Sequence, residues 1–460
     1  CGAGGLSSAV GEMAKDTGAD VDLKQVRLKY PGLAPWEIWL SEAQERMVVA
    51  VPELNKNDLQ KLCDTFDVEL TDIGAFTETG HIVVRYDSRV VLDLANDFLH
   101  DGMPRRELQA VIPDVPLALK GAGEGRRDLD RVLLELLAHP NIASKADVIR
   151  IYDHEVLGGT VVKPLTGAMN DGPSDACVLK PIGTKGTRGI VLSCGINAEY
   201  GKSDPYRMAI SVIDEAIRNA VAVGADPDRI ALLDHFCWGD PLRLETLGSL
   251  IEAARGCYDA ALHYRTPFIS GKDSLNNEYL GADGLRHAIP PTLLISAIGI
   301  IEDVNRAVTM DLKEVGNVVY LLGTTEDGGR RTDGDSVFAL PAHAPEMYRA
   351  LHRAMRAGLV RACHDLSEGG LAVAAAEMCI GGRLGMNLEC DDDTLFAESN
   401  GCLLVEVRPG DCAAFEAHFA DLQSQVRQIG KVTGDNRLTM GAGKISAAVA
   451  ELVAAWNGSA

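Results

Sequence analysis

The sequence lacks the patterns that mark several common classes of protein. Its eleven cysteines are scattered, without a CxxC pair or a Cys/His cluster, which argues against a structural zinc site and for a reducing compartment. No apolar run approaches the length of a membrane span, and the first residues do not have the pattern of a signal peptide. From these absences we expect a cytoplasmic protein.

Positive charge is also scarce. The 44 lysines and arginines are outnumbered by 66 aspartates and glutamates, which gives a formal net charge of -22 at pH 7. A net charge of this sign disfavours a partner with a phosphate backbone, such as DNA. It does not exclude a phosphorylated small molecule, because backbone amides and metal ions recognise such a ligand locally.

Familiar catalytic signatures are absent as well. No Ser/His/Asp or Cys/His constellation stands out, and we interpret His235 and His364 as lone histidines on loops with structural or exposed polar roles. The order GKDS at 271–274 is not preceded by GxxxxGK, so a P-loop is not expected. The sequence also begins at Cys1, inside a glycine-rich turn and without an initiator methionine, which indicates a fragment or a processed chain.

An internal repeat is the most informative feature that is present. The stretch CGAGGLSSAVGEMA at 1–14 reappears, altered, as LSEGGLAVAAAEMC at 366–379. At a second offset, nine residues shorter, Glu42 corresponds to Glu398 and Ile73 to Ile429. The chain therefore holds two copies of one domain of roughly a hundred residues. A protein built as A-B-A′-B′ would look like this if its first part were absent.

Hydrophobic patterning predicts an α+β fold with mixed sheets. We expect the first copy at 1–103, a connector with a glycine-rich hinge at 104–157, an intervening domain at 158–306 and the second copy at 307–460. A polar helix carrying Leu59, Leu62 and Phe66 is expected in the first copy. The other expected helices span 7–17, 129–139, 205–223 and 244–264, and the expected strands span 46–51, 81–86, 175–180, 188–194, 229–236, 266–270 and 291–304.

The first candidate site is CHDLSEGGL at 363–371. Asp365 and Ser367 lie on a loop here, and Gly369-Gly370 open a helix. Amides at a helix start bind anions, and a neighbouring carboxylate can hold Mg²⁺ against a phosphate. An ordinary helix cap with a tight turn would use the same residues. Both copies of the repeat keep the double glycine, which favours the functional interpretation.

Two further candidates could supply ligands for a hard cation. Glu215 and Asn219 lie four residues apart on one face of the expected helix at 205–223, near Ser211 and Arg218. A solvated helix face is the alternative. Asp175 follows a Gly-Pro turn at the start of a strand, and it could equally be a turn carboxylate.

The end of the strand at 266–270 is a candidate phosphate site. Gly271, Lys272, Asp273 and Ser274 follow it directly, and glycine lets a ligand approach the backbone while lysine and serine donate to phosphate. A polar turn is the alternative. Asp234 likewise follows an apolar strand, as a Walker B-like carboxylate or as an ordinary satisfied one.

The loop SEAQER at 41–46 is the last candidate. Glu42 and Gln44 are potential substrate contacts at the entry of a strand, and a surface loop is the alternative.

Taken together, these motifs resemble the phosphoribosylformylglycinamidine synthase family, the PurL-type synthetases of the aminoimidazole ribonucleotide synthetase superfamily. The resemblance runs over nearly the whole chain, through SEAQERM at 41–47, PNIASK at 140–145, YDHEV at 152–156, SDPYRMA at 203–209, RNAVAVGADP at 218–227, SGKDS at 270–274 and HDLSEGGLAVAAAEM at 364–378. It implies tandem PurM-like N-terminal and C-terminal domains with the C-terminal domain duplicated. It also implies that the first N-terminal domain, which carries the family's catalytic histidine, is missing.

The resemblance implies an ATP-dependent amidation in purine biosynthesis. ATP would phosphorylate the formamide oxygen of formylglycinamide ribonucleotide, and ammonia would displace phosphate from the resulting iminophosphate to form the amidine. The cofactors would be ATP and Mg²⁺. The partners would be a glutaminase subunit that supplies ammonia, a small bridging subunit and the missing N-terminal domain, with no nucleic acid and no membrane.

Site residues follow from the same resemblance. Lys272 stands where small-type members have a metal-binding Asn, so its ammonium would bind phosphate directly, and Asn197 falls near where a catalytic half would place its histidine. The intervening domain is therefore expected to be the non-catalytic partner. The implied substrate contacts are Glu42, Ala43, Gln44 and Ser274, the ATP contacts are Lys145, Asp234, Gly271, Lys272 and Ser367, and the metal ligands of an auxiliary nucleotide site are Asp175, Glu215, Asn219 and Asp365.

Two other functions remain open from the sequence. A different ATP-dependent ligase of the superfamily, such as a cyclo-ligase or a selenophosphate synthetase, would usually have one N–C pair of domains. A nucleotide-stabilised scaffold without activity of its own is the other alternative, and we expect the 460 residues alone to be inactive.

Overall fold

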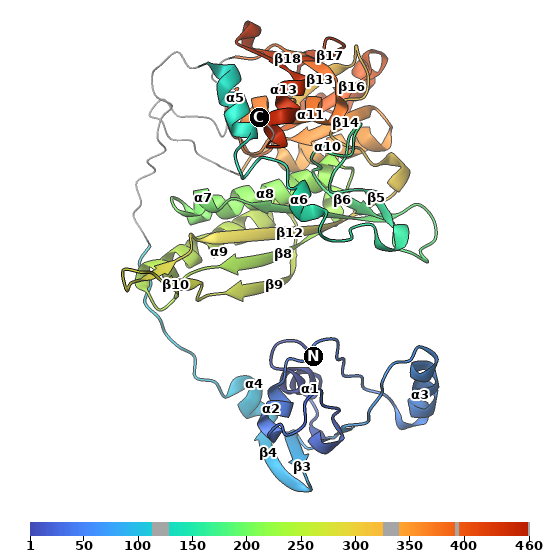
Figure 1. Ribbon diagram of the computed structural model, residues 1–460, viewed down its shortest axis with the longest axis vertical. Coiled ribbons are helices and arrows are strands. Elements are labelled where there is room, and N and C mark those ends of the chain that lie inside the picture. Colours follow the sequence, from blue (N-terminus) through green and yellow to red (C-terminus); the bar gives the residue numbers. More distant parts are fainter. Residues whose placement is uncertain (113–127, 325–339, 392–394, 459–460) are drawn as a thin grey trace. The chain divides into compact units, whose positions relative to one another are not determined.

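The computed structural model describes residues 1–112, 128–324, 340–391 and 395–458 (Figure 1). The chain divides into two compact units, Cys1–Leu108 and Gln109–Ala460. The finer boundaries expected inside the second unit stay a prediction, and the expected hinge at 121–125 lies outside the described residues. In the described part of the chain, no helix has both the length and the apolar character needed to cross a bilayer.

The first unit is built on a four-stranded sheet in the order β2-β1-β3-β4. The strands are β1 (Ala19–Asp22), β2 (Gly74–Phe76), β3 (His81–Tyr86) and β4 (Arg89–Ala95), and the helices are α1 (Leu6–Met13), α2 (Pro35–Leu40), α3 (Lys56–Thr65) and α4 (Asn96–Asp101). The core packs α1 and α2 on the sheet through side chains that include Leu6, Val10, Val21, Ile38, Ile82 and Val84. The predicted strand at 81–86 and the polar helix before it are confirmed.

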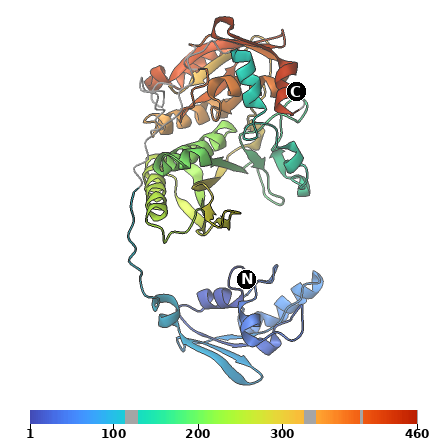
Figure 2. The same ribbon diagram turned by 60° about the vertical axis from the view of Figure 1, so that its left-hand side comes forward.

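The second unit contains a six-stranded sheet in the order β5-β6-β7-β12-β8-β9 and a two-stranded β10-β11 ribbon. The helices α8 and α9 cover one face of the larger sheet (Figures 1 and 2). Its strands are β5 (Thr160–Val162), β6 (Cys177–Leu179), β7 (Gly189–Ile196), β8 (Ile230–Cys237), β9 (Phe268–Ser274), β10 (Glu278–Leu280), β11 (Arg286–Ala288) and β12 (Thr292–Ile301), and its helices are α6 (Ala146–Ile149), α7 (Ala198–Gly201), α8 (Pro205–Ala222) and α9 (Leu244–Tyr264). The elements predicted between 175 and 304 are confirmed, with ends that differ by a few residues.

A seven-stranded sheet completes the second unit, in the order β14-β16-β13-β17-β15-β18-β19. Its strands are β13 (Val318–Leu322), β14 (Val360–Asp365), β15 (Gly385–Leu388), β16 (Leu403–Val407), β17 (Val426–Thr433), β18 (Arg437–Met440) and β19 (Ile445–Ala448), and the helices with it are α10 (Ala344–Arg356), α11 (Gly370–Gly382), α12 (Cys412–Ala417) and α13 (Val449–Trp456). The connector helix α5 (Leu129–Leu137), predicted at 129–139, buries Leu133 and Leu137 in the same core as α11 and α13.

The four-stranded sheet of the first unit and one part of the seven-stranded sheet share the same strand topology. In the first unit β2 pairs antiparallel with β1, β1 parallel with β3, and β3 antiparallel with β4. In the second unit β17, β15, β18 and β19 follow each other with the same three orientations. The internal repeat seen in the sequence is therefore a repeat of strand order and direction.

The predicted strand at 46–51 is wrong, because this segment is irregular. Its counterpart at the second offset, β16, pairs on both sides, with β13 and β14. The first unit, whose residues are all described, offers no strand in the place of either partner, so the segment has no ladder to join. The predicted helix at 7–17 is also shorter, since α1 ends at Met13.

Candidate functional site

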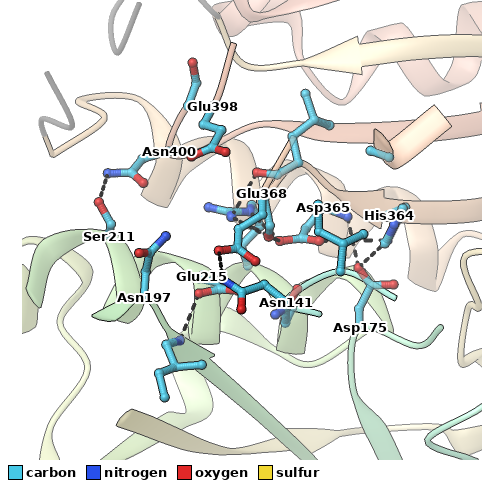
Figure 3. Close-up of a pocket in the computed structure, with 18 of the residues that line it drawn as sticks. Asn141, Asp175, Asn197, Ser211, Glu215, His364, Asp365, Glu368, Glu398 and Asn400 are labelled. Atoms are coloured by element: carbon cyan, nitrogen blue, oxygen red, sulfur yellow. Dashed lines mark hydrogen bonds and ion pairs between the residues drawn. The ribbon is translucent and has the colours of Figure 1, made fainter. Parts of the chain in front are cut away.

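A cavity of about 250 Å³ lies where α8, β14 and the turn before α11 meet. Figure 3 shows Asp175, His364 and Asp365 gathered on one side of this cavity and Ser211, Glu398 and Asn400 on the other. The cavity is lined by residues of both the six-stranded and the seven-stranded sheet regions. Five of the predicted residues line it: Asp175, Glu215, Asn219, Asp365 and Ser367.

The helix α8 carries two of these residues because of how it is capped and packed. It begins at Pro205, and the Asp204 side chain caps it by accepting a hydrogen bond from the Arg207 amide at 2.9 Å. Glu215 and Asn219, one turn apart, meet the end of β7. The Ile196 amide donates to Glu215 Oε2 at 3.0 Å, and Asn219 Nδ2 donates to the Cys194 carbonyl at 3.2 Å.

The double glycine opens α11 by a turn that only glycine adopts easily. Gly369 and Gly370 have φ values of +80° and +62°, and a Cβ on Gly370 would lie 2.5 Å from the Ala397 carbonyl oxygen. The first copy repeats this arrangement. Gly5 has a φ of +59°, and its Cβ would lie 2.2 Å from the Ser41 carbonyl oxygen. The turn is therefore a shared structural requirement of both copies.

A glutamate holds the glycine turn in each copy. Glu398 Oε1 accepts a hydrogen bond from the Gly369 amide at 2.9 Å, and Glu42 Oε1 accepts one from the Gly4 amide at 3.1 Å. The phenol of Tyr200 also donates to Glu398. The Glu42 carboxylate, predicted as a substrate contact, thus has a structural partner in the first unit.

The side of the cavity that holds His364 and Asp365 is organised around Asp175. Its Oδ1 accepts hydrogen bonds from the Asp365 amide and from His364 Nδ1, both at 2.9 Å. His364 Nε2 lies 3.0 Å from Glu377 Oε2. One ligand atom from each of Asp175, His364 and Asp365 lies within 4.8 Å of the others.

The interpretation of the two histidines as lone loop residues is wrong. His364 is 5% exposed, lies in β14 and contacts two carboxylates, and His235 lies in β8. The internal repeat aligns Glu12 with Glu377, and this match could have pointed to Glu377 as a partner in the site. Asp175 lies 189 residues away from His364, so no local pattern pairs them.

Burial and crowded negative charge shift the acids and bases of the cavity. Burial, with the Asp365 charge, raises the pKa of Glu215 to about 8. Burial also raises the pKa of Glu368 and that of Glu377. Burial opposes a charge on His364, but Asp175 and Glu377 outweigh it and hold the pKa of the imidazole well above its usual range. The imidazolium therefore donates to both carboxylates.

The donor set fits a hard divalent cation. Asp175 Oδ2 and Asn219 Oδ1 are buried without a hydrogen-bond partner, and a buried polar atom left without one is costly. Carboxylate and amide oxygens are the ligands that Mg²⁺ prefers. The cavity is lined by six carboxylates, on Asp175, Glu215, Asp365, Glu368, Glu377 and Glu398, and by one arginine, Arg218.

Lys145 and Asn197, the remaining residues expected near this site, have local hydrogen-bond partners. Lys145 is not among the residues that line the cavity. Its ammonium donates to the Asn141 and Ala143 carbonyls. Burial lowers the pKa of Lys145, although the negative charges of Glu368 and Glu377 act to raise it. Asn197 lines the cavity, and its side chain caps α7 by accepting from the Tyr200 amide at 3.2 Å. Glu368, Glu398, Tyr200 and Asn141 also line the cavity and were not predicted.

The predicted ATP contacts Asp234, Gly271 and Lys272 and the predicted substrate contact Ser274 lie on the adjacent parallel strands β8 and β9. Asp234 stands opposite Gly271 in the ladder, and a Cβ on Gly271 would lie 2.2 Å from Asp234 Oδ1. Burial, with the charge of Asp273, raises the pKa of Asp234. A side chain at 271 would therefore displace the Asp234 carboxylate from its present position.

The predicted substrate contacts Glu42, Ala43 and Gln44 belong to the first unit. They follow α2 in an irregular segment in which Glu45 has a φ of +60°. Arg46 Nη2 donates to the Ser41 carbonyl at 2.6 Å and ties the two ends of the segment together.

Comparison with family models assigns both kinds of domain. Residues 1–87 and 314–443 match the C-terminal domain of AIR synthase related proteins, and residues 173–301 match the N-terminal domain. The two C-terminal matches establish the duplication, and the α+β fold class is confirmed.

Curated relatives extend the match over nearly the whole chain. A phosphoribosylformylglycinamidine synthase subunit PurL from Thermoplasma volcanium is 30% identical over 453 residues, covering 94% of this chain and 58% of the relative. The subunit PurL from Deinococcus radiodurans is 32% identical over 476 residues, covering 96% and 61%. The chain thus spans about three-fifths of the length of the curated relatives that it matches.

Solved structures show the same fold. The structure of PurLQS from Thermotoga maritima matches with a TM-score of 0.66 at 21% identity, covering 94% of this chain and 63% of that chain. The T. maritima PurL structure complexed with FGAR matches with a TM-score of 0.65 at 22% identity, covering 94% and 61%.

Proposed function

The chain belongs to the AIR synthase related proteins as a homologue of the PurL subunits of phosphoribosylformylglycinamidine synthase, and we propose that it forms the larger part of such a synthetase. The proposed reaction is the ATP-dependent amidation of formylglycinamide ribonucleotide. The γ-phosphoryl group of ATP moves to the carbonyl oxygen of the substrate's glycinamide group, ammonia adds to that carbonyl carbon, and phosphate leaves to give the amidine, with the formyl group unchanged. The other product is ADP.

The observation that supports this proposal most directly is the convergence of oxygen ligands on the 250 Å³ cavity. The six acidic side chains of the cavity outnumber its two cationic ones, Arg218 and His364, and in their ionised form they repel a nucleotide polyphosphate unless metal cations lie between them. We propose that Asp175, Glu215, Asn219 and Asp365 hold Mg²⁺ here. The ion would neutralise phosphate charge, which is the chemistry it supplies in nucleotide sites.

The chain's own donors complete the proposed nucleotide site. Ser367 lies in the turn that precedes α11, where the positive end of the helix dipole favours phosphate. The cavity thus offers cation ligands on one side and anion donors next to them. Lys145, whose ammonium lies within electrostatic range of Glu368, is the proposed counter-charge at the rim.

A second candidate function is a nucleotide-stabilised half without activity of its own. The observation that favours it is Asn197, whose side chain caps α7 near the place where the family resemblance puts a catalytic histidine. In this case the auxiliary nucleotide would stabilise the fold without being turned over. A cyclo-ligase or another single-pair ligase of the superfamily is disfavoured by the duplicated C-terminal domain.

The amidation chemistry is proposed to use the predicted substrate and ATP contacts that are not among the residues lining this cavity. Glu42, Ala43, Gln44 and Ser274 would contact the formylglycinamide ribonucleotide, and Asp234, Gly271 and Lys272 would contact ATP. Ammonia would come from a glutaminase subunit, together with a small bridging subunit. The PurLQS assembly of T. maritima is a precedent for a PurL chain in a larger complex.

Calorimetric titration of the 460-residue chain with ADP, with and without Mg²⁺, tests the auxiliary site. Binding that requires Mg²⁺ and is abolished by Asp365→Ala is expected. The matched control is Asp228→Ala, which removes a carboxylate paired with an arginine, Arg349, outside the cavity and leaves binding unchanged. Equal affinity with and without Mg²⁺, or unchanged binding in the Asp365 variant, would refute the proposed site.

A further inference from the structure

A buried polar network lies directly behind the cavity. Its centre is Asp214 on α8, which is fully buried. The carboxylate accepts hydrogen bonds from the phenols of Tyr264 and Tyr348, both at 2.6 Å, and from the Gly401 amide at 2.8 Å. Arg218 donates to the same carboxylate from Nη1. These donors come from α8, α9, α10 and the turn before β16, so the network joins the two sheet regions of the second unit.

Arg218 carries this network to the cavity. Its Nη2 donates to Asp365 Oδ2 at 3.0 Å and to the Leu366 carbonyl at 3.1 Å, and its Nε lies 3.3 Å from the same Oδ2. The Ser367 hydroxyl also donates to Oδ2. In the described part of the chain, Asp365 Oδ1 accepts no hydrogen bond, and its near neighbour is His364 Nδ1 at 3.9 Å. The two oxygens of Asp365 therefore have different environments.

We propose that Asp214 and Arg218 are positioning residues for the metal site, and that Tyr348 ties this positioning to the packing of α10. The proposal rests on the proposed function of the cavity. Arg218 holds Oδ2 by two nitrogens, which fixes the plane of the Asp365 carboxylate and leaves Oδ1 for a cation. Asp214 in turn fixes Arg218, and the two phenols fix Asp214.

The physical reason is that groups behind a metal ligand set its orientation and charge. Loss of such a partner typically lowers metal affinity by about 10–100-fold. Arg218 and Asp214 are both nine-tenths or more buried, so neither can exchange its partner for water. A phenol removed from Asp214 leaves that carboxylate short of a donor, and the guanidinium that it anchors becomes less restrained.

A matched pair of tyrosine variants separates positioning from simple stabilisation. Tyr348→Phe removes one phenol from Asp214, and Tyr320→Phe removes the phenol of another buried tyrosine, which donates to Glu416 at 2.7 Å in a partly exposed hydrogen bond away from the cavity lining. Both changes delete one hydrogen bond to a carboxylate. Both are expected to lower the thermal unfolding midpoint, and Tyr348→Phe by at least as much, because its hydrogen bond is fully buried.

The readout is Mn²⁺ binding to the 460-residue chain in the presence of ADP, followed by the loss of the free-ion electron paramagnetic resonance signal. Tyr348→Phe is expected to weaken Mn²⁺ binding about tenfold, and Tyr320→Phe is expected to leave it unchanged. Arg218→Lys keeps the positive charge but loses the contact of two nitrogens with Asp365 Oδ2. This variant is expected to weaken Mn²⁺ binding by at least as much as Tyr348→Phe.

The outcomes distinguish two failures. If the wild-type chain binds no Mn²⁺ with ADP, the proposed nucleotide site is refuted and the positioning proposal falls with it. If the wild type binds but Tyr348→Phe and Arg218→Lys bind equally well, only the positioning proposal is overturned. If Tyr348→Phe does not fold, Tyr264→Phe makes the same deletion on α9 and is judged by the same criterion.

Discussion

At the residue scale, the sequence located the acids of the site but not their partners. Asp175, Glu215, Asn219 and Asp365 were predicted as one set from resemblance, and the structure places them on one cavity. The roles of Arg218, His364 and Glu377 were not predicted. The contacts of Arg218 with Asp365 and of His364 with Asp175 join residues 147 and 189 positions apart, and such contacts depend on how distant segments meet in three dimensions.

Glu215 gives a pH prediction for the ligand-free protein. Its pKa is raised from 4.5 to about 8 in the folded state by burial. The folded chain therefore holds a proton that the unfolded chain has lost, and this contribution to stability disappears as the pH rises from about 4.5 to about 8. Glu215→Gln removes that dependence.

We expect Glu215→Gln to be more stable than the wild type at pH 8 and close to it at pH 5, measured by urea unfolding with a chelator present. The same variant should bind ADP with Mg²⁺ at least about tenfold more weakly, since an amide is a poorer cation ligand. A stability difference that is the same at both pH values would contradict the assignment of the raised pKa.

The two glycine turns give a paired prediction. Gly5→Ala and Gly370→Ala each place a Cβ against a carbonyl oxygen at a positive φ, so each should cost at least about 1–2 kcal/mol. The controls are Gly2→Ala and Gly410→Ala, where no atom lies within 4 Å of the added Cβ and φ is not positive. Amide hydrogen exchange localises each effect, and a variant as stable as its control would refute the shared turn.

At the element scale, helices and strands with a strong hydrophobic pattern were predicted well. The expected range 244–264 is α9 itself, and 81–86 is β3. The segment at 46–51 has the composition of a strand but no neighbouring strand to pair with. The hydrophobic pattern of one segment does not show whether a partner strand is present. Strand order could not be predicted either, because it is set by pairing between distant segments.

The connector helix gives a prediction at this scale. Leu133 on α5 is fully buried in the core that contains α11 and α13. Leu133→Ala should lower the free energy of unfolding by about 2–5 kcal/mol through the cavity it leaves. Arg131→Ala on the exposed face of α5 is the control and should have no measurable effect. Equal stability of the two variants would show that α5 is not part of this core.

At the scale of the whole molecule, the chain combines two C-terminal domains with one N-terminal domain of the AIR synthase related type. Both copies use a glutamate to hold the amide of the glycine turn, at Glu42 and Glu398. The duplication was visible in the sequence because this turn tolerates few residue types. The cavity described here is lined by the second copy together with residues of the six-stranded sheet region, of α8 and of the connector.

We predict that the 460-residue chain alone does not convert formylglycinamide ribonucleotide with ATP and ammonia. The reason is that the family resemblance assigns the catalytic histidine to a domain other than the N-terminal domain present here. A coupled assay for ADP release checks this, with the same chain shown to bind ADP as the control for folding. Measurable amidation by this chain would contradict the assignment of its N-terminal domain as the non-catalytic one.

The central claim is that the carboxylates of the cavity hold divalent cations against a polyphosphate. The most direct test is anomalous diffraction from crystals of this chain grown with ADP and Mn²⁺. We predict an anomalous peak within coordination distance of oxygens from Asp175 and Asp365, with the diphosphate on its other side. A nucleotide bound elsewhere, or a cavity that contains no metal peak at saturating Mn²⁺, would contradict the account.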